Sequence, residues 1–385
     1  MKKLKISGIG CALIDYLYNN ISFTSTEIQP YFSRKEGDGG ISPGKLVFRD
    51  ELESFAGETY EEILRRITGS KTPDAKNIGG PAIVSMIHLA QMLEQKADIR
   101  FIGALGKDKT GNDLLHFIKK TPLQPDYLQF FDAPTPFTHV LSDPEFNEGE
   151  GERTFINNIG AADELKLPGN DFYNADICVF GGTALVPHIH DSLDEHLHRA
   201  RSKGAFTVVN TVYDFRNQKN APDFPWPLGK GHAAIPMIDL LIMDMEEALK
   251  ISGKGDGDSA MEFFIRLGSK AVVITQGAED IRVFASDEIF SNSVNMTFPV
   301  SQKAKSDLKC SGVRGDTTGC GDNFAGGMIT SLAEQLINSP GAKPDIVDMI
   351  RMGRASGGFA CFYLGGTYFE ENAGEKRQKV NRYLD

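Results

Sequence analysis

The sequence is poor in the features that mark several common protein classes. Its five cysteines are odd in number and never form a C-x-x-C pair, which argues against a disulfide framework and a structural zinc site. The longest apolar runs are strand-sized, well short of the roughly 20 residues that span a bilayer. Basic runs are also absent and the formal net charge is -11, which disfavours nucleic acid and anionic membranes as partners. A small-molecule ligand is the better expectation.

What is present is an ordinary globular composition, with 41% hydrophobic and 24% charged residues. A chain of this length can form one large α/β domain with an appendage. The first residues, MKKLKISGIGC, lack the apolar segment and the cleavage site of a secretory signal, so they predict a first strand. We expect a soluble, cytoplasmic protein with a single domain over residues 1–385.

Short β-rich runs alternate with helical patterns along most of the chain. LKISGIGCALI and the helical PAIVSMIHLAQMLEQ are followed by DICVFGG, AFTVVN, IDLLIMD and AVVITQG, with further helical patterns among them. This alternation predicts an α/β fold, a mainly parallel sheet covered by helices on both faces. Such sheets bind ligands beyond the carboxyl ends of their strands.

Two polar segments, residues 16–77 and residues 131–162, interrupt the alternation. They are surface insertions on one interpretation, because long loops are tolerated at low free-energy cost. On the other, parts of both form one small β-rich lid that closes over the ligand site. Arg153, in the second segment, lies beside the acidic run EGEGE, and we expect it to form a surface ion pair outside the site.

The densest cluster of chemistry-bearing residues is VRGDTTGCGDNFAGG, residues 313–327. Several glycines together indicate that the backbone approaches another group closely. The apolar spacing after Gly321 predicts a helix, whose first N–H groups and dipole can hold an anion. Asp322 falls in the first turn of that helix. It either stabilises the helix start or accepts a proton from a hydroxyl that attacks phosphorus.

Two other phosphate-binding patterns fail on inspection. GGISPGK, residues 39–45, is followed by Leu46 where a phosphate loop needs Ser or Thr, and no apolar strand precedes it. The first strand carries Gly8 and Gly10 but has Leu13 where a dinucleotide fingerprint needs its third glycine. The stretch at residues 313–327 is therefore the candidate anion site.

GDTTGCGDNFAGG resembles the D-T-x-G-A-G-D signature of the ribokinase-like carbohydrate kinases, the PfkB family, with Cys320 in place of the usual Ala. Other segments are similar to that family's motifs and follow its order. They are GGPAIVSMIHLAQML, FIGALGKDKTGNDL, DLLIMDMEEALKISG and VITQGAEDI. The resemblance covers nearly the whole chain except the insertion after Asp15, and it implies a ribokinase-like three-layer α/β/α sandwich.

The resemblance also implies which residues bind the acceptor. Asp15 matches the aspartate that holds the sugar hydroxyls, a sensible role for a short carboxylate that accepts two hydrogen bonds. As a turn residue at the end of a strand it would need no such role. Gly79 and Gly80 match the double glycine that packs against the sugar. Val84 stands where the family has an asparagine, so one polar contact to the sugar is lost.

On the phosphate side, the family pattern implies that Glu247 and Asp244 hold the Mg²⁺ that accompanies ATP, with Asp244 replacing the family's asparagine. As acids at a helix start, both would also be unremarkable. Thr275 and Gly277 resemble the turn that lies along the phosphates, and Asp316 is expected beside ATP. Potassium near the anion site is left open.

The expected function is ATP-dependent phosphorylation of a hydroxyl on a small sugar. Asp322 would be the general base, and the N–H groups of Gly319, Cys320 and Gly321 would stabilise the phosphoryl group in transit. A nucleoside kinase of the same fold is the first alternative, favoured if aromatic residues of the insertion stack on a base. A catalytically weak binding regulator is the second, suggested by Val84 and Asp244. A homodimer through the lid is also implied by the resemblance.

Overall fold

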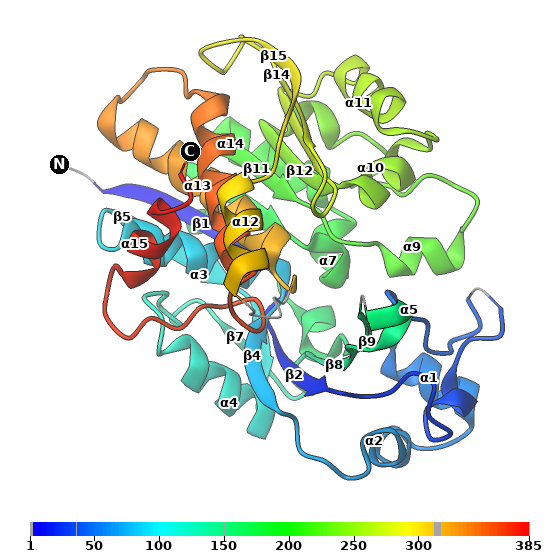
Figure 1. Ribbon diagram of the computed structural model, residues 1–385. Coiled ribbons are helices and arrows are strands. Elements are labelled where there is room, and N and C mark those ends of the chain that lie inside the picture. Colours follow the sequence, from blue (N-terminus) through cyan, green and yellow to red (C-terminus); the bar gives the residue numbers. More distant parts are fainter. Residues whose placement is uncertain (1–2, 36, 150, 312–316, 385) are drawn as a thin grey trace.

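The computed structural model describes residues 3–35, 37–149, 151–311 and 317–384 (Figure 1). Within them, eight strands form the main sheet in the order β15-β14-β13-β12-β11-β10-β1-β5. Their bounds are β1 (Leu4–Gly10), β5 (Ala97–Ile102), β10 (Ile177–Gly181), β11 (Phe206–Asn210), β12 (Leu240–Asp244), β13 (Ala271–Thr275), β14 (Ile281–Ala285) and β15 (Val294–Phe298). The pairs from β5 to β13 are parallel, while β14 and β15 are antiparallel at one edge.

Alternate side chains of the central strands enter two separate hydrophobic cores. In β12, Leu240 and Ile242 face one core, whereas Leu241 and Met243 face the other. This period of two is the geometry of a strand buried on both faces. It explains why the strands are nearly continuous apolar runs in the sequence.

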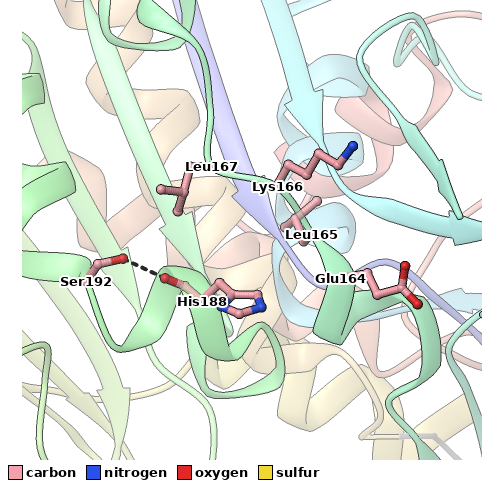
Figure 2. A pocket seen from close by; sticks show the side chains of 6 residues that line it. All are labelled: Glu164, Leu165, Lys166, Leu167, His188 and Ser192. Carbon is pink, nitrogen blue, oxygen red and sulfur yellow. Dashed lines mark hydrogen bonds between the residues drawn. The ribbon is translucent and has the colours of Figure 1, made fainter.

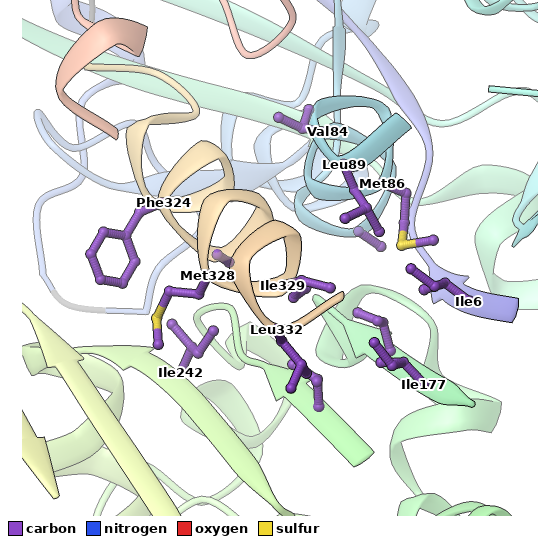
Figure 3. Packing of buried hydrophobic residues seen from close by; sticks show 14 of the residues in the cluster. Ile6, Val84, Met86, Leu89, Ile177, Ile242, Phe324, Met328, Ile329 and Leu332 are labelled. Carbon is purple, nitrogen blue, oxygen red and sulfur yellow. The ribbon is translucent and has the colours of Figure 1, made fainter. Parts of the chain in front are cut away.

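Helices cover both faces of the sheet, so the molecule has three layers and the α/β prediction is confirmed. The first core lies under α3 (Pro81–Leu93), α13 (Cys320–Asn338) and α14 (Ile346–Ala360). Figure 3 shows Met328 of α13 beside Ile242 of β12, while Ile329 lies on the side of α13 nearer α3. The second core lies under α8 (Leu193–Ser202), α10 (Met245–Ser252) and α11 (Gly257–Arg266).

A second, smaller sheet has five strands in the order β3-β9-β8-β2-β4. They are β2 (Leu13–Asn19), β3 (Leu46–Phe48), β4 (Ala75–Gly79), β8 (Phe137–Asp143) and β9 (Glu152–Asn158). Residues 16–77 and residues 131–162, far apart in the sequence, therefore share one sheet. Sequence analysis had expected Asp15 at the end of the first strand. That strand ends at Gly10, and Asp15 lies inside β2, the first strand of the small sheet.

The insertion also contains two helices that the sequence analysis did not predict, α1 (Arg49–Ala56) and α2 (Tyr60–Thr68), at the lower right of Figure 1. Helix α2 begins after Thr59, whose backbone N–H donates to Glu62 at 3.2 Å, and it ends at Gly69 in the left-handed region. Its Tyr60 and Ile63 join a third core against the small sheet. We call this covered side the outer face of the small sheet.

The remaining elements complete the layers. They are β6 (Ala104–Gly106), β7 (Gln129–Phe131), α4 (Lys109–Ile118), α5 (Phe146–Gly149), α6 (Asn170–Tyr173), α7 (Pro187–His190), α9 (Phe215–Asn220), α12 (Gln302–Ser311), α15 (Glu375–Asn381), η1 (Gln29–Tyr31), η2 (Gly160–Glu164), η3 (Thr183–Leu185) and η4 (Ile235–Met237). Within the described ranges, no helix combines the length and the apolar character needed to cross a membrane.

Candidate active site

The turn before α13 is shaped by glycine. Gly319 caps the helix with φ 75°, in the left-handed region, and a Cβ added there would lie 2.5 Å from the Cα of Gly366. The N–H of Cys320 donates to the carbonyl of Thr317 at 3.2 Å. The first N–H groups of a helix have no partner inside it, so this turn presents backbone donors outward. Asp316 lies outside the described residues.

Gly321, the third residue of this turn, is exposed, and a Cβ added to it would meet no atom of the described residues within 4 Å. The space in front of the helix start is therefore open on this side. An anion can approach the donors there without a side chain in its way.

Asp322 is half-buried in the first turn of α13, and burial raises the pKa of its carboxyl to about 7. Its own carbonyl accepts a hydrogen bond from Ser85 Oγ at 3.0 Å, which joins α13 to α3. A carboxyl that titrates near neutral pH can take up a proton and release it under the same conditions. This is the property that a general base needs.

Asn323 holds the turn in place through hydrogen bonds from its side chain. The sequence analysis did not predict this residue. Its Nδ2 donates to the carbonyls of Gly319 and Gly366, both at 2.8 Å. Its Oδ1 accepts from Lys376 Nζ at 2.9 Å and from Tyr363 at 3.2 Å. Lys376 is 1% exposed, and burial lowers its pKa to about 7. Since Lys376 lies 53 residues from Asn323, no local pattern reveals this contact.

The two acids predicted to hold metal lie at the end of β12 and the start of α10. Asp244 Oδ1 accepts from the N–H of Glu247 at 2.8 Å, and Glu247 Oε2 accepts from the N–H of Asp244 at 3.0 Å. Thr211 also donates to Glu247 Oε2 at 2.6 Å. Burial, then the charge of Asp244, raises the pKa of Glu247 to about 8, with a further contribution from Asp322. Three carboxyl groups thus share one region of negative potential, which favours a cation.

These acids suit Mg²⁺ in their chemistry but do not form a complete metal site. Among the described residues, no three His, Cys, Asp or Glu side chains converge tightly enough to hold a metal. Magnesium prefers oxygen ligands and usually keeps several waters, binding through one or two carboxylates and substrate phosphates. Glu247 and Asp244 fit that pattern.

The turn after β13 lies beside these acids. Thr275, the last residue of β13, is paired with Asp244 in the sheet register, and its hydroxyl donates to the carbonyl of Met243 at 3.5 Å. Gly277 follows with φ 55°, and a Cβ there would meet no atom within 4 Å. The structure thus brings Thr275, Asp244 and Glu247 to one edge of the main sheet, with Gly277 in the adjoining turn.

On the opposite side, Asp15 and Gly79 are packed against each other. Asp15 is 6% exposed, and a Cβ added to Gly79 would lie 2.2 Å from Asp15 Oδ2. Gly80 follows with φ 100° and begins α3. Val84 is buried, and a Cβ added to Gly366 would lie 2.9 Å from its Cγ2. Val84 therefore packs against the C-terminal loop, which explains an apolar residue where the family has asparagine.

The face of the small sheet that carries Asp15 is rich in polar side chains, and we call it the inner face. The register places Thr138 next to Asp15 and Asn157 next to Thr138. Asn157 Nδ2 donates to Thr138 Oγ1 at 2.9 Å. A cavity of about 620 Å³ continues along this face to the turn before α13. Its lining includes Leu17, Asn19, Val140, Ser142, Arg153, Thr317 and Leu364.

Arg153 was left out of the site by the sequence analysis, but it contacts the turn before α13. Its guanidinium donates to the hydroxyls of Thr317 and Thr318, so a side chain of β9 reaches across the cavity. The register between β8 and β9 places Arg153 there, because it lies opposite Ser142 and both residues line the cavity. The spacing Arg153, Phe155, Asn157 could have suggested a shared face, since alternate residues of a strand point the same way.

A second cavity, of about 430 Å³, lies apart from the turn before α13 (Figure 2). It is lined by Glu164, Leu165, Lys166, Leu167, His188 and Ser192. Inside it, Ser192 donates to the carbonyl of His188. Its lining offers none of the convergent backbone donors and carboxyl groups found at the start of α13. Among the described residues, the lining of neither cavity includes a predicted site residue, but the first cavity reaches Thr317 in the turn before α13.

Comparisons with known proteins agree with this geometry. Residues 68–373 match the model of the pfkB family carbohydrate kinases. A protein of Arabidopsis thaliana named probable fructokinase-6, chloroplastic, is 27% identical over 314 residues, which are 78% of this chain and 73% of the relative.

Two solved structures share the fold at low sequence identity. Adenosine kinase of Schistosoma mansoni in complex with 2-fluoroadenosine has a TM-score of 0.69 and 16% identity, covering 96% of this chain and 98% of that one. Fructokinase of Xylella fastidiosa with bound ATP has a TM-score of 0.63 and 17% identity, covering 100% and 98%. At such identities the likeness shows the fold alone.

Proposed function

We propose that this chain, which belongs to the pfkB family of carbohydrate kinases, transfers the γ-phosphoryl group of ATP to a hydroxyl of a small sugar with Asp322 as the general base. The family and the enzyme class, a sugar-kinase phosphotransferase, confirm the sequence predictions. One observation carries the mechanistic part. A carboxyl group whose pKa is raised to about 7 lies in the first turn of a helix whose start is open to an anion.

In the proposed reaction, Asp322 accepts the proton of the acceptor hydroxyl as its oxygen bonds to phosphorus. The backbone N–H groups of Gly319 and Gly321 stabilise the charge on the phosphoryl oxygens, together with that of Cys320, which exchanges its hydrogen bond to the Thr317 carbonyl for one to the phosphoryl group. Asn323 holds their turn in place. Arg153 adds a positive charge beside the same turn. Phosphoryl transfer depends mainly on such positioning and charge stabilisation.

ATP and a divalent metal follow from the family. We assign the metal to Glu247 and Asp244, whose carboxyl groups lie together where β12 meets α10. When bound, Mg²⁺ neutralises charge on the ATP phosphates. Thr275 and Gly277 are proposed to lie along those phosphates. Potassium near the turn stays a prediction, as does Asp316 beside ATP.

A sugar is favoured over a nucleoside because of where the aromatic residues lie. Phe23, Tyr31 and Tyr60 of the insertion are buried in the core on the outer face, away from the cavity. The inner face offers Asp15 and other polar side chains suited to hydroxyl groups. A nucleoside kinase remains the second candidate, because the register also places Phe155 on the inner face, where it could stack on a base.

Four further expectations remain, and the contacts bear on the first and the third of them. A silent regulator is disfavoured, because Val84 has a packing role and Asp244 still caps α10. The small sheet is proposed to act as a lid that excludes water. A homodimer through this lid stays a prediction, and α1 and α2 of the same chain already cover the apolar outer face. The cytoplasmic location also stays an expectation.

The test is Asp322→Asn, assayed for ADP release with a panel of sugars, sugar acids and nucleosides. The amide keeps the shape but cannot accept the proton, so we expect kcat to fall about 10²- to 10⁴-fold with little change in ligand affinity. Asp348→Asn is the matched control, because Asp348 is an exposed acid in the first turn of α14. Wild-type turnover by Asp322→Asn would exclude Asp322 as the base.

A further inference from the structure

Cys320 and Cys361 form a pair of thiols where the start of α13 meets the end of α14. Their Sγ atoms lie 3.3 Å apart, and both residues are partly exposed to solvent. Cys320 is the first residue of α13, and Cys361 is the C-cap of α14. The sequence analysis noted Cys320 only as a replacement for the usual Ala, and the proposed reaction uses its backbone, not its sulfur.

The two helices are held closely together at this point. A Cβ added to Gly357 of α14 would lie 3.1 Å from the carbonyl oxygen of Cys320. Cys361 Sγ donates to the carbonyl of Gly357 at 3.7 Å. A disulfide has an S–S length of about 2.05 Å, so closing this one requires the sulfurs to approach by roughly 1.2 Å in total.

Of the other three cysteines, two are too buried to react readily with an oxidant and one is exposed. Cys11 and Cys178 are buried, and burial raises the pKa of each thiol to about 12, so little reactive thiolate forms. Cys310 is exposed on α12. It therefore provides an internal comparison for oxidation that depends on exposure alone.

We propose that Cys320 and Cys361 are a redox modification site, at which a peroxide forms a disulfide that switches off the phosphoryl transfer proposed above. One thiol attacks hydrogen peroxide, the O–O bond breaks, and a sulfenic acid and one water form. The second sulfur then bonds to the sulfenic sulfur, the S–O bond breaks, and a second water leaves with the thiol proton. Overall, two thiols and one peroxide give one disulfide and two waters.

The disulfide inhibits because it acts on the backbone of the anion site. Cys320 contributes one of the N–H groups proposed to stabilise the phosphoryl group, and its neighbour Gly319 is fixed by Asn323 and Gly366. Drawing Cys320 towards α14 displaces donors whose geometry must be accurate for catalysis. A dithiol reductant restores the site by thiol–disulfide exchange.

The experiment treats the full chain with hydrogen peroxide, then measures intact mass, disulfide-mapped peptides and ATP-dependent turnover, before and after a dithiol reductant. We expect a loss of two hydrogens, a peptide that links Cys320 to Cys361, and at least about a 10-fold fall in turnover that the reductant reverses. Cys361→Ala should keep the reduced rate and resist inactivation. Cys310→Ser should be inactivated like the wild type.

Each readout separates this proposal from the proposed function. The disulfide is detected by mass whether or not the chain phosphorylates a sugar, so an inactive protein that still forms the link would count against the function alone. Peroxide adducts on Cys320 without a linked peptide would overturn the disulfide. A linked protein with an undiminished rate would overturn the switch.

Discussion

The starts of α3 and α13 are built alike and differ in what fills the space before them. Both follow an N-cap glycine with positive φ, Gly80 at 100° and Gly319 at 75°, and the helices are joined where Ser85 donates to the carbonyl of Asp322. At α3 the preceding glycine is pressed against the protein's own carboxylate, since Gly79 has no room for a Cβ beside Asp15. At α13, Gly321 faces open space.

The difference teaches that a glycine can be required for different physical reasons, which a sequence does not distinguish. Gly79 makes room for a side chain of the protein itself, and Gly321 leaves space open in front of a helix. Gly326 and Gly327, in the same glycine-rich stretch, allow helices to pack closely. A Cβ on Gly326 would lie 2.9 Å from the Cβ of His88, and one on Gly327 would lie 2.4 Å from Ser356 Oγ. Among the glycines of the stretch that the structure describes, Gly319 and Gly321 lie at the proposed site, whereas Gly326 and Gly327 pack helices together.

The largest effect in this comparison is expected at Asp15, the carboxylate that fills the start of α3. Asp15→Ala removes the proposed hydrogen bonds to the acceptor hydroxyls, so KM for the acceptor should rise about 10²-fold. KM for ATP should stay nearly unchanged. Initial rates with each substrate varied in turn provide the measurement. Leu17→Ala, on the same face of β2, is the control for altered packing, and equal losses on both substrates would make Asp15 structural.

The comparison itself is tested by adding one methyl group to each helix start. Gly321→Ala should fold normally but lower kcat by about 10-fold or more, because its Cβ enters the space proposed for phosphate. Gly79→Ala should instead lower the free energy of unfolding by about 1–3 kcal/mol, because its Cβ overlaps the Asp15 carboxylate. Urea denaturation and turnover separate the two. If both variants lose stability equally, the distinction between the helix starts fails.

Much of the proposed site could be predicted from the sequence because its parts are local, and its residues stay predictions. The turn through Gly319, the acid at Asp322 and the strand ends at Asp244 and Thr275 each lie within a few residues of a readable pattern. The register of β9, which brings Arg153 to the turn, depends on pairing with β8 over the whole strand, and no short pattern reports it. The helices α1 and α2 were missed because the insertion was judged by its overall polar composition. The few apolar residues on one side of each helix were not considered separately.

Arg153 extends the comparison, because its guanidinium contacts the turn at the start of α13. Arg153→Met removes the positive charge beside Thr317 and Thr318, so we expect kcat/KM for ATP to fall about 10-fold. Steady-state kinetics at saturating acceptor would measure it. Arg49→Met is the matched control, because Arg49 pairs with Glu53 and Glu61 beneath the outer face. Activity equal to that of the control variant would remove Arg153 from the site.

The smallest expected effect concerns stability and the charge of Asp322. Its pKa is about 7 in the folded protein, above its ordinary value of 3.8, so the folded state holds this proton more tightly than the unfolded state. The resulting stabilisation is complete below about pH 4 and is lost as the pH rises through 7. Glu247, with a pKa of about 8, acts in the same direction, whereas the lowered pKa of Lys376 acts in the opposite one.

Because these groups oppose one another, the informative quantity is the difference in melting temperature between Asp322→Asn and the wild type. At about pH 4 Asp322 is largely neutral in the folded state and close to neutral in the unfolded state, so the two proteins should melt within about 1 °C of each other. Near about pH 8.5 the wild-type carboxylate is ionised against its burial, so the variant should melt higher, by about 1–3 °C. Thermal unfolding without nucleotide or metal measures both values. A difference that stays constant with pH would mean that the start of α13 does not disfavour the charge of Asp322. The aspartate would then be an ordinary acid at a helix start, no different in kind from Asp348.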